Sequence, residues 1–333
     1  MQFITILVSS SLLLSLLLNY SFNQLFLKRN KIDKVKPRSS HNVIATKSGG
    51  VAIFSSLGII TIFLYATSNE IFDFSLLLPL GIIFFTGVYD DFYDANFKLK
   101  FFLQIIVAKL LIDQGFLINN FHGLFGFYEI PYLLAQLTTI FTFVVIVNAI
   151  NFSDGIDGLA CSLGIYCLII LEIFMGLKSE LMYLNLISAV LIIPFYFFNS
   201  KKKNKVFLGD AGSLFLGAIV AINIFNFLSN DKSVEVFYNP AIISIVVLIY
   251  PLVDLLRVFI LRIKSGNSPF VADQNHLHHK LIFISNNHYI RTLLIILSSI
   301  CVLFIILMLE FNFDSIYSIV FILLLQMLTF KIK

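Results

Sequence analysis

The sequence predicts an all-α polytopic membrane protein with about eleven transmembrane helices in a single domain, residues 1–333. Of its 333 residues, 59% are hydrophobic and only 13% are charged, whereas about a quarter of the residues of soluble globular domains are charged. Apolar runs long enough to cross about 30 Å of hydrocarbon as helices recur along the whole chain. There is no fixed-period repeat that would indicate a modular array.

The expected spans follow one another with short connections, and each is an apolar run bounded by polar or charged residues. They are 2–27, 50–68, 75–89, 100–118, 131–150, 159–177, 181–198, 212–228, 240–261, 292–309 and 314–330. The first run lacks a basic segment before it and a small-residue cleavage site after it, so we interpret it as a retained span. The cysteines fall within apolar runs without paired spacing and are expected to be core residues: Cys161, Cys167 and Cys301.

Lysine and arginine give the orientation, because basic residues are retained on the cytoplasmic side. All of the 23 basic residues except Lys109, Lys178 and Lys232 belong to one set of span ends. The amino terminus is therefore expected outside and the carboxyl terminus in the cytoplasm. The polar motifs of the chain then all face the cytoplasm. The net charge of +4 resides mainly in these loops, which favours contact with anionic lipids rather than nucleic acid.

Adjacent carboxylates end the third span, in Gly87-Val88-Tyr89-Asp90-Asp91. Two neighbouring carboxylates repel each other unless a cation or a shared proton relieves them. The pair therefore indicates a metal or phosphate-transfer role, or alternatively a solvated loop start beside Lys98 and Lys100.

Four polar side chains connect the fifth and sixth spans: Asn148, Asn151, Asp154 and Asp157. The members of each pair are three residues apart, which predicts that each pair shares one face of a helix. Helix capping accounts for at most one of these groups. Gly155 and Gly158 allow a close backbone approach at this point.

Two further motifs lie at predicted cytoplasmic ends. Phe207-Leu208-Gly209-Asp210-Ala211-Gly212-Ser213 precedes the eighth span, where free amides attract anions or a carboxylate holds a divalent cation. The last cytoplasmic segment contains Asp254, Arg257, Arg262, Asp273, His276, His278 and His279. A His-x-His-His cluster is compatible with zinc, but its basic neighbours favour phosphate binding. Isolated histidines, His122 and His288, are expected to be structural.

In this order, the motifs closely resemble the polyprenyl-phosphate N-acetylhexosamine-1-phosphate transferases of glycosyltransferase family 4. This membrane superfamily also contains phospho-N-acetylmuramoyl-pentapeptide transferase. The resemblance covers nearly the whole chain and includes Pro37-Arg38-Ser39-Ser40-His41, Gly49-Gly50, Lys100, Gln104 and the four motifs described above.

The resemblance implies a Mg²⁺-dependent enzyme that transfers a sugar-1-phosphate from a UDP-N-acetylhexosamine to undecaprenyl phosphate and releases UMP. Mn²⁺ is the alternative ion. The implied catalytic residues are Asp90, Asp91, Asp157 and His279. The implied metal ligands are Asp210 and Asn151. The implied substrate-binding residues are Lys47, Lys100, Asn148, Asn151, Asp154, Asn199, Phe207, Arg257, His276 and His278.

The pattern Asn-His-Leu-His-His-Lys-Leu is similar to the N-acetylhexosamine branch and implies N-acetylglucosamine-1-phosphate as the transferred group. The expected product is the first lipid-linked sugar of a cell-surface polysaccharide, made at the bacterial plasma membrane; a homodimer is compatible with this. Ala45 replaces a common Pro, and a lysine-rich stretch, Ser200 to Lys205, replaces a usual Pro-Ala pair. A muramoyl-pentapeptide donor, a 6-deoxy sugar donor and a lipid or solute transporter stay open as alternatives.

Overall fold

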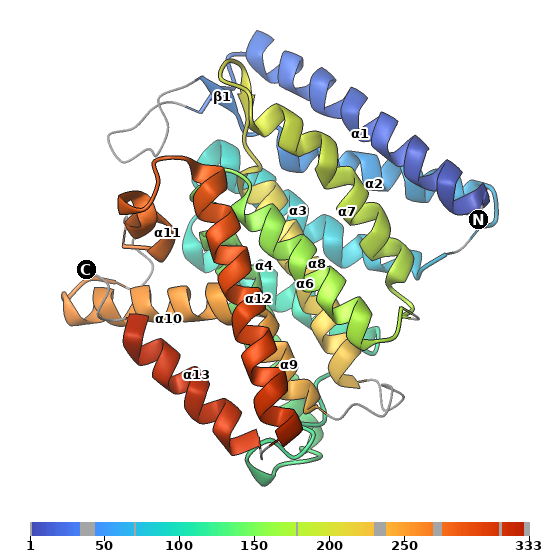
Figure 1. The fold of residues 1–333 in the computed structure, drawn as a ribbon. Coiled ribbons are helices and arrows are strands. Elements are labelled where there is room, and N and C mark those ends of the chain that lie inside the picture. Colours follow the sequence, from blue (N-terminus) through green and yellow to red (C-terminus); the bar gives the residue numbers. More distant parts are fainter. Residues whose placement is uncertain are drawn as a thin grey trace. The chain divides into compact units, whose positions relative to one another are not determined.

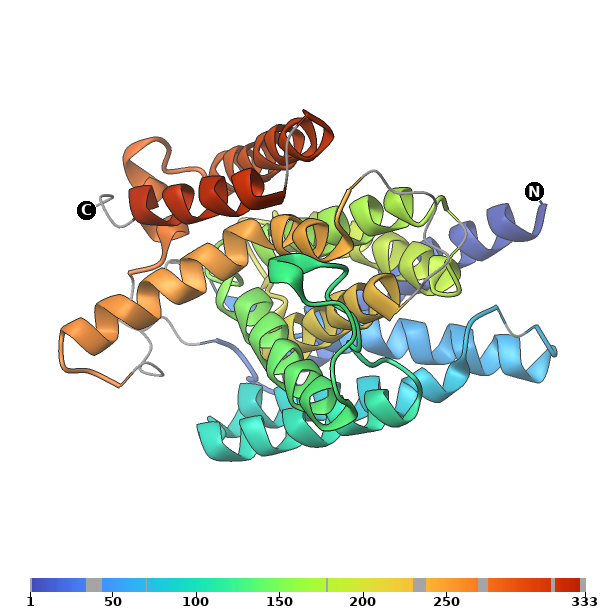
Figure 2. The ribbon, with the colours of Figure 1, turned by 90° about the horizontal axis from the view of Figure 1, so that it is seen from below.

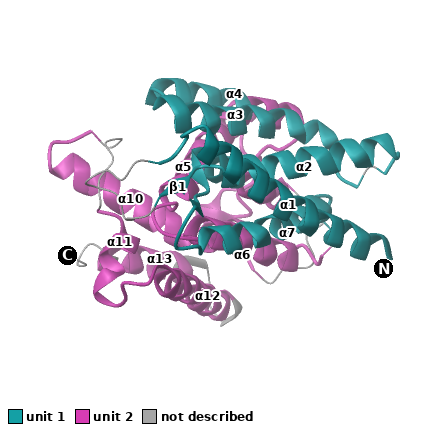
Figure 3. Ribbon diagram, turned by 90° about the horizontal axis from the view of Figure 1, so that it is seen from above, with its two compact units in different colours: residues 1–107, 178–219 teal, residues 108–177, 220–333 magenta. Residues whose placement is uncertain are grey.

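The computed structural model describes residues 2–33, 44–69, 71–177, 179–229, 238–268, 275–312 and 315–329. These residues form two compact units, each discontinuous in sequence (Figure 3). Unit 1 contains residues 1–107 and 178–219, and unit 2 contains residues 108–177 and 220–333. Two of the three unit boundaries fall inside helices, α4 (Phe97–Asp113) and α8 (Gly209–Ser229).

Unit 1 is built from long helices and one short parallel strand pair (Figure 1). In chain order its other elements are α1 (Gln2–Lys28), β1 (Ala45–Thr46), α2 (Gly49–Ala66), the 3-10 helix η1 (Phe74–Leu76), α3 (Leu77–Tyr93), α7 (Met182–Asn199) and β2 (Lys205–Val206). Helix α1 packs against α2 and α7, and α2 also contacts α3 and α7.

Polar residues form most of the packed face of α1. The buried residues recur every four positions, so they lie on one helical stripe: Leu7, Ser11, Ser15, Asn19 and Asn23. The Ser15 hydroxyl donates to the carbonyl oxygen of Leu191 in α7 at 2.7 Å. Membrane helices associate through such small residues because lipid surrounds their apolar side chains equally well.

Unit 2 contains the remaining elements. They are η2 (Leu124–Gly126), α5 (Tyr132–Phe152), α6 (Leu159–Phe174), α9 (Pro240–Val247), α10 (Ile249–Lys264), α11 (Leu277–Lys280), η3 (Leu281–Phe283), α12 (His288–Asn312) and α13 (Ser315–Thr329). Helices α12 and α13 contact each other, and Figures 1 and 2 both show them side by side.

All eleven expected spans coincide with helices, which confirms the all-α membrane fold class. Within the described residues, seven helices are long and apolar enough to cross a membrane, or eight if a bent pair counts as one span. Helices α6 and α13 are apolar but shorter, and the expected span 100–118 ends at Asp113 in α4. The count of eleven crossings, their orientation and the single domain stay predictions.

The expected span 240–261 differs from a straight helix. It consists of α9 and α10, which are bent by 68° at a break. Pro251 lies in the first turn of α10 and has no N–H to donate to the carbonyl of Val247, four residues earlier. The Cys167 thiol donates to that carbonyl instead, with a sulfur–oxygen distance of 3.6 Å.

Candidate functional site

In unit 1, a strand pair fixes the backbone around the predicted carboxylate site. Ala45 pairs with Lys205 and Thr46 with Val206 in parallel register. The pairing continues beyond the strands, because the Phe207 N–H donates to the Thr46 carbonyl at 2.8 Å, and the Gly49 N–H donates to the Phe207 carbonyl at 3.0 Å. Lys47 and the start of α8 are thereby held in one framework.

Glycines let three helices of unit 1 meet at this framework. A Cβ atom on Gly50 would lie 2.2 Å from the backbone nitrogen of Gly212. A Cβ atom on Gly87 would lie 2.4 Å from the carbonyl oxygen of Asp210. No side chain fits at such distances, so the glycines of these motifs allow α2 and α3 to approach the amino end of α8.

The side chain of Asp91 binds the amino end of α8. Its two carboxylate oxygens each accept a backbone N–H at 3.0 Å, one from Asp210 and one from Ala211. The Lys47 ammonium lies 3.1 Å from the same carboxylate, whose side chain is only 4% exposed. A carboxylate at the free amides of a helix start is stabilising. This geometry indicates that Asp91 positions α8.

Asp90 and Asp210 hold the more available carboxylates. One oxygen of Asp90 accepts the Ala95 N–H at 2.8 Å, and the other lies 2.5 Å from the Lys100 ammonium. The Asp210 side chain lies within hydrogen-bonding reach of Asp90. Two carboxyl groups in contact require a proton or a cation between them.

Lys47 stays charged despite its burial. Desolvation lowers its pKa, but the carboxylates of Asp91 and Asp210 outweigh this effect and raise the pKa above the ordinary value of a lysine. Lys47 and Lys100 therefore provide permanent positive charge beside the three carboxylates, which is suited to holding phosphate oxygens.

Asn199 and Phe207, both predicted to bind substrate, are also in unit 1. Asn199 is buried at the end of α7, and its amide donates to the carbonyl of Val206 at 2.8 Å. The Lys205 ammonium lies 5.6 Å from the centre of the half-buried Phe207 ring. Asn199 thus supports β2, and Phe207 follows β2 directly.

In unit 2, the Asn-Asp motif is not helical throughout. Asn148 and Asn151 lie in α5, and the Asn148 amide donates to the Val144 carbonyl at 2.7 Å. Asp154 and Asp157 instead lie in turns between α5 and α6. The predicted helical face for this second pair is wrong, because Gly158 adopts φ +74° and starts α6 anew.

Asp157 has a partner that the sequence did not indicate. Nδ1 of His288, the first residue of α12, lies 2.9 Å from Oδ2 of Asp157 and 3.3 Å from its backbone nitrogen. The Thr292 hydroxyl donates to the Asp157 carbonyl at 3.1 Å. His288 was expected to be structural, yet it contacts a predicted catalytic residue. The ring of His122, by contrast, contacts the protein backbone: its Nε2 lies 2.9 Å from the carbonyl oxygen of Leu228.

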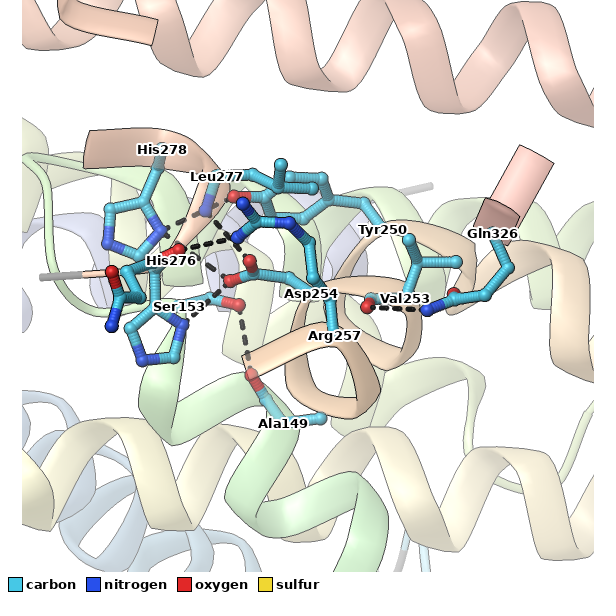
Figure 4. Close-up of polar contacts among 11 residues, drawn as sticks. Ala149, Ser153, Tyr250, Val253, Asp254, Arg257, His276, Leu277, His278 and Gln326 are labelled. Carbon is cyan, nitrogen blue, oxygen red and sulfur yellow. Dashed lines mark hydrogen bonds and ion pairs between the residues drawn. The ribbon is translucent and has the colours of Figure 1, made fainter. Parts of the chain in front are cut away.

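The histidine cluster is built around Asp254 in α10 (Figure 4). Nδ1 of His276 lies 2.8 Å from one Asp254 oxygen, and the Leu277 N–H donates to the other at 2.8 Å. Two buried arginines hold the same segment: Arg257 donates to the Asn275 carbonyl at 2.6 Å, and Arg291 donates to the His278 carbonyl at 2.9 Å.

The three histidines have different surroundings. His278 is fully buried, with Nδ1 3.3 Å from the Tyr250 hydroxyl, and its Nε2 lies 2.2 Å from where a Cβ on Gly155 would be. Burial, followed by the nearby positive groups, lowers the pKa of His278 well below its usual range and lowers the pKa of His279 to about 4. Both rings are therefore neutral at pH 7.

Tyr250, Arg291 and His288 were missed by sequence reasoning. Arg291 offered a signal, because a basic residue just inside an apolar helix is costly unless paired. Tyr250 offered none, since a tyrosine in an apolar run is ordinary core. Two parts of the predicted site, Pro37–His41 and Asp273, lie outside the described residues.

The side chains present indicate which metal ions the protein could bind. Among the described residues, no three His, Cys, Asp or Glu side chains form a metal-ligating group. Mg²⁺ needs less from the protein, because it is commonly held by one or two carboxylates plus water and substrate phosphates. The contacting carboxyls of Asp90 and Asp210 fit that requirement. Asn151, the other predicted ligand, belongs to unit 2.

These features define a polytopic α-helical membrane protein with polar clusters at helix ends. Residues 73–227 match the model of the family described as Glycosyl transferase family 4. A probable undecaprenyl-phosphate N-acetylglucosaminyl 1-phosphate transferase of Bacillus subtilis (strain 168) is 30% identical over 299 residues, covering 86% of this chain and 79% of the relative. The chain belongs to glycosyl transferase family 4 and is an enzyme of the transferase type.

Two further relatives have related names. An undecaprenyl-phosphate alpha-N-acetylglucosaminyl 1-phosphate transferase of Yersinia pestis is 28% identical, covering 77% of this chain and 70% of the relative. A decaprenyl-phosphate N-acetylglucosaminephosphotransferase of Mycobacterium tuberculosis (strain ATCC 25618 / H37Rv) is 29% identical, covering 78% of this chain and 71% of the relative. The predicted resemblance to polyprenyl-phosphate sugar-1-phosphate transferases is confirmed.

Proposed function

We propose that this protein transfers N-acetylglucosamine-1-phosphate from its UDP-activated form to undecaprenyl phosphate and releases UMP. The similarity to the Bacillus subtilis relative, which spans 79% of that protein, is the observation that carries the proposal. The names of the Yersinia pestis and Mycobacterium tuberculosis relatives agree on the sugar phosphate and differ only in the polyprenyl carrier.

The reaction exchanges one phosphoanhydride for another. An oxygen of the lipid phosphate attacks the sugar-linked phosphorus of the donor, a new phosphorus–oxygen bond forms, and the bond to the UMP phosphate breaks. The second pKa of a phosphate monoester is about 6, so the lipid phosphate is largely a dianion at pH 7. The main barrier is the approach of two anions, and catalysis rests on positioning and charge neutralisation.

The unit 1 cluster supplies groups for this task. Lys47 and Lys100 would bind phosphate oxygens through their positive charge. Their ammonium groups are held in the cluster, 3.1 Å from Asp91 and 2.5 Å from Asp90 respectively. Asp210 and Asp90 would hold Mg²⁺, or Mn²⁺ in its place. The bound ion would offset charge on non-bridging phosphate oxygens. Asp91 would keep the amino end of α8 in place.

The unit 2 cluster supplies neutral and cationic donors. Arg257 and the histidines would contact substrate phosphates, with His279 as the expected catalytic residue. Asn148, Asp154 and Asp157 would contact the donor. We place the site at the cytoplasmic face of the bacterial plasma membrane, because nearly all basic residues belong to that set of loops.

Turnover of the purified protein tests this function. The assay contains detergent, undecaprenyl phosphate, Mg²⁺ and one UDP-sugar at a time, and the measurement is UMP release. UDP-N-acetylglucosamine should give UMP and a lipid-linked sugar diphosphate. Turnover only with UDP-N-acetylmuramoyl-pentapeptide or with a 6-deoxy donor would replace the proposed donor. Movement of substrate across a vesicle without UMP would refute the reaction in favour of transport.

The same assay with a chelator tests the metal dependence. Chelation should stop UMP release, and Mg²⁺ should restore it with Mn²⁺ as a weaker substitute. Full activity after chelation would exclude the proposed metal role.

A further inference from the structure

We infer that Asp254 is a positioning residue for His276: it holds Nδ1 of the ring inside the protein and thereby presents Nε2 as the donor to a phosphate oxygen. The inference rests on the proposed function, because it assigns His276 to one of the two phosphorylated substrates. It adds a residue, Asp254, that the predicted catalytic and binding sets do not contain.

Asp254 is occupied entirely by the protein. Its side chain is 2% exposed. One oxygen lies 2.8 Å from His276 Nδ1, and the other accepts the Leu277 N–H at 2.8 Å. The same N–H and imidazole fix both oxygens, so Asp254 is poorly placed to bind a metal or a substrate itself. A buried carboxylate is costly unless it is paired in this way.

The contact with Asp254 determines which nitrogen of His276 is left for a ligand. A carboxylate accepts hydrogen bonds, so Nδ1 must carry a proton. Within the described part of the chain, this is the only hydrogen bond made by the His276 ring. Nε2 is therefore the ring atom available to a ligand, and it donates when the ring is an imidazolium. The Asp254 carboxylate supplies the counter-charge for that form.

Packing fixes the plane of the ring as well. The His278 ring is stacked on His276, with centroids 5.4 Å apart and an interplanar angle of 14°. The Phe152 ring packs beside His276, with centroids 5.8 Å apart and an interplanar angle of 51°. His278 is itself buried and held through its backbone by Arg291. The direction of Nε2 is thus set before a substrate arrives, which is the condition for effective electrostatic stabilisation.

The other two histidines are less suited to this role. The His278 Nε2 faces Gly155 and has no hydrogen-bond partner among the described residues. Within the same described ranges, His279 shows no carboxylate contact of the kind that His276 makes with Asp254. His278 Nδ1 also lies 3.9 Å from the same Asp254 oxygen, but the Tyr250 hydroxyl is closer to it, at 3.3 Å. Of the three rings, His276 is the one that contacts Asp254 at hydrogen-bonding distance, the arrangement in which a carboxylate orients an imidazole toward a ligand.

The test combines nuclear magnetic resonance of ¹⁵N-labelled histidine with the UMP assay, on the full chain in detergent. The protein contains 6 histidines, so His276→Gln identifies the His276 signals by their loss. In the wild type, Nδ1 should carry a proton throughout, and titration with inorganic pyrophosphate should bring a second proton to Nε2, so that the bound ring shows both N–H signals. In Asp254→Asn an amide can donate to Nδ1, so only Nε2 should carry a proton and pyrophosphate should not produce the doubly protonated ring.

Activity should follow the same pattern. Asp254→Asn and His276→Gln should each lower kcat by about 10- to 100-fold, as the loss of a carboxylate that orients a histidine does elsewhere. The double variant should be no worse than His276→Gln alone, since both changes remove one function. Arg291→Gln is the structural control: it removes the hydrogen bond to the His278 carbonyl but leaves the contact of His276 with Asp254, so it should leave the Nδ1 proton in place.

Three results would overturn the inference. The first is an unchanged tautomer of His276 in Asp254→Asn, and the second is no pyrophosphate shift at His276. The third is a loss of kcat in Asp254→Asn that equals the loss in Arg291→Gln, together with multiplying effects in the double variant of Asp254 and His276. Absence of UMP release from the wild type would instead remove the proposed function. The pyrophosphate titration would still decide the role of Asp254.

Discussion

The polar clusters of the two units are built by opposite means. In unit 1, backbone contacts position the charged groups, through the β1–β2 pairing and glycines that admit neighbouring main chain. In unit 2, buried side chains do so, since Asp254, Arg257 and Arg291 each hold the segment 275–278. The unit 1 cluster is rich in carboxylates and suits a cation. The unit 2 cluster is rich in N–H donors and suits anions.

The largest expected effect concerns the carboxylate-rich cluster of unit 1. Asp210→Asn removes a carboxylate that we assign to Mg²⁺, and UMP release should fall by about 10³-fold or more. Detergent-solubilised protein should keep its melting temperature. Asp113→Asn is the matched control, because that exposed carboxylate pairs with Lys109, four residues away on the surface of the same helix. Near-normal turnover of Asp210→Asn would remove the metal role from unit 1.

The next effect separates Asp91 from its neighbour. Asp91→Asn leaves Lys47 without its ion-pair partner and turns an amide toward the start of α8. The free energy of unfolding should fall by about 2 kcal/mol, measured by denaturation in detergent. Asp90→Asn should lower turnover with a smaller loss of stability. A stable Asp91→Asn protein without activity would mean that Asp91 acts on substrate.

A methyl group added at Gly155 in unit 2 should have a somewhat smaller effect on stability. In Gly155→Ala the new Cβ would lie 2.2 Å from Nε2 of His278, so the buried ring must move. Overpacking of this kind costs about 1–3 kcal/mol. The loss should appear in denaturation together with changed His278 resonances. Gly58→Ala is a control in unit 1, because no described atom lies within 4 Å of the point that its new methyl group would occupy. Equal stability of the two variants would contradict the tight contact.

The pH dependence of α11 follows from its neutral histidines. The pKa of His279 is lowered from 6.5 to about 4, mainly by desolvation. The folded segment therefore binds fewer protons than the unfolded one between these values, so its stability is complete above pH 6.5 and falls as the pH drops toward 4. Hydrogen exchange of residues 275–281 should accelerate over this range. His279→Gln should weaken the dependence; an unchanged dependence would assign it to other groups.

The smallest expected effect concerns His288. His288→Ala removes the contact at 2.9 Å with Asp157, whose side chain is 12% exposed. The turn that holds Asp157 should loosen, and KM for the UDP-sugar should rise by a few-fold, equivalent to about 1 kcal/mol. His122→Ala is the matched control, because the contact of that ring among the described residues is with a backbone carbonyl. Equal KM values for the two variants would leave His288 without a role at Asp157.

The sequence was informative where chemistry is local. Hydropathy located helices at all eleven expected spans, and the adjacent Asp90 and Asp91 do lie at the end of one of them. It failed where tertiary partners decide the outcome. Two-residue strands carry no periodic signal, and Pro251 marked a break that an apolar run concealed. His288 lies 131 residues from Asp157, and only folding brings the two together.

The register of Ala45 with Lys205 also constrains how the protein is made. During synthesis, helices α1 to α4 emerge long before α7 and β2, and contacts between distant parts of a chain form slowly. Membrane insertion of the early helices must therefore precede completion of unit 1. Unit 1 is completed by residues 178–219, which are synthesised after the first part of unit 2, residues 108–177. A ribosome stalled before residue 205 would display an amino-terminal half whose loop after α1 still lacks its partner strand.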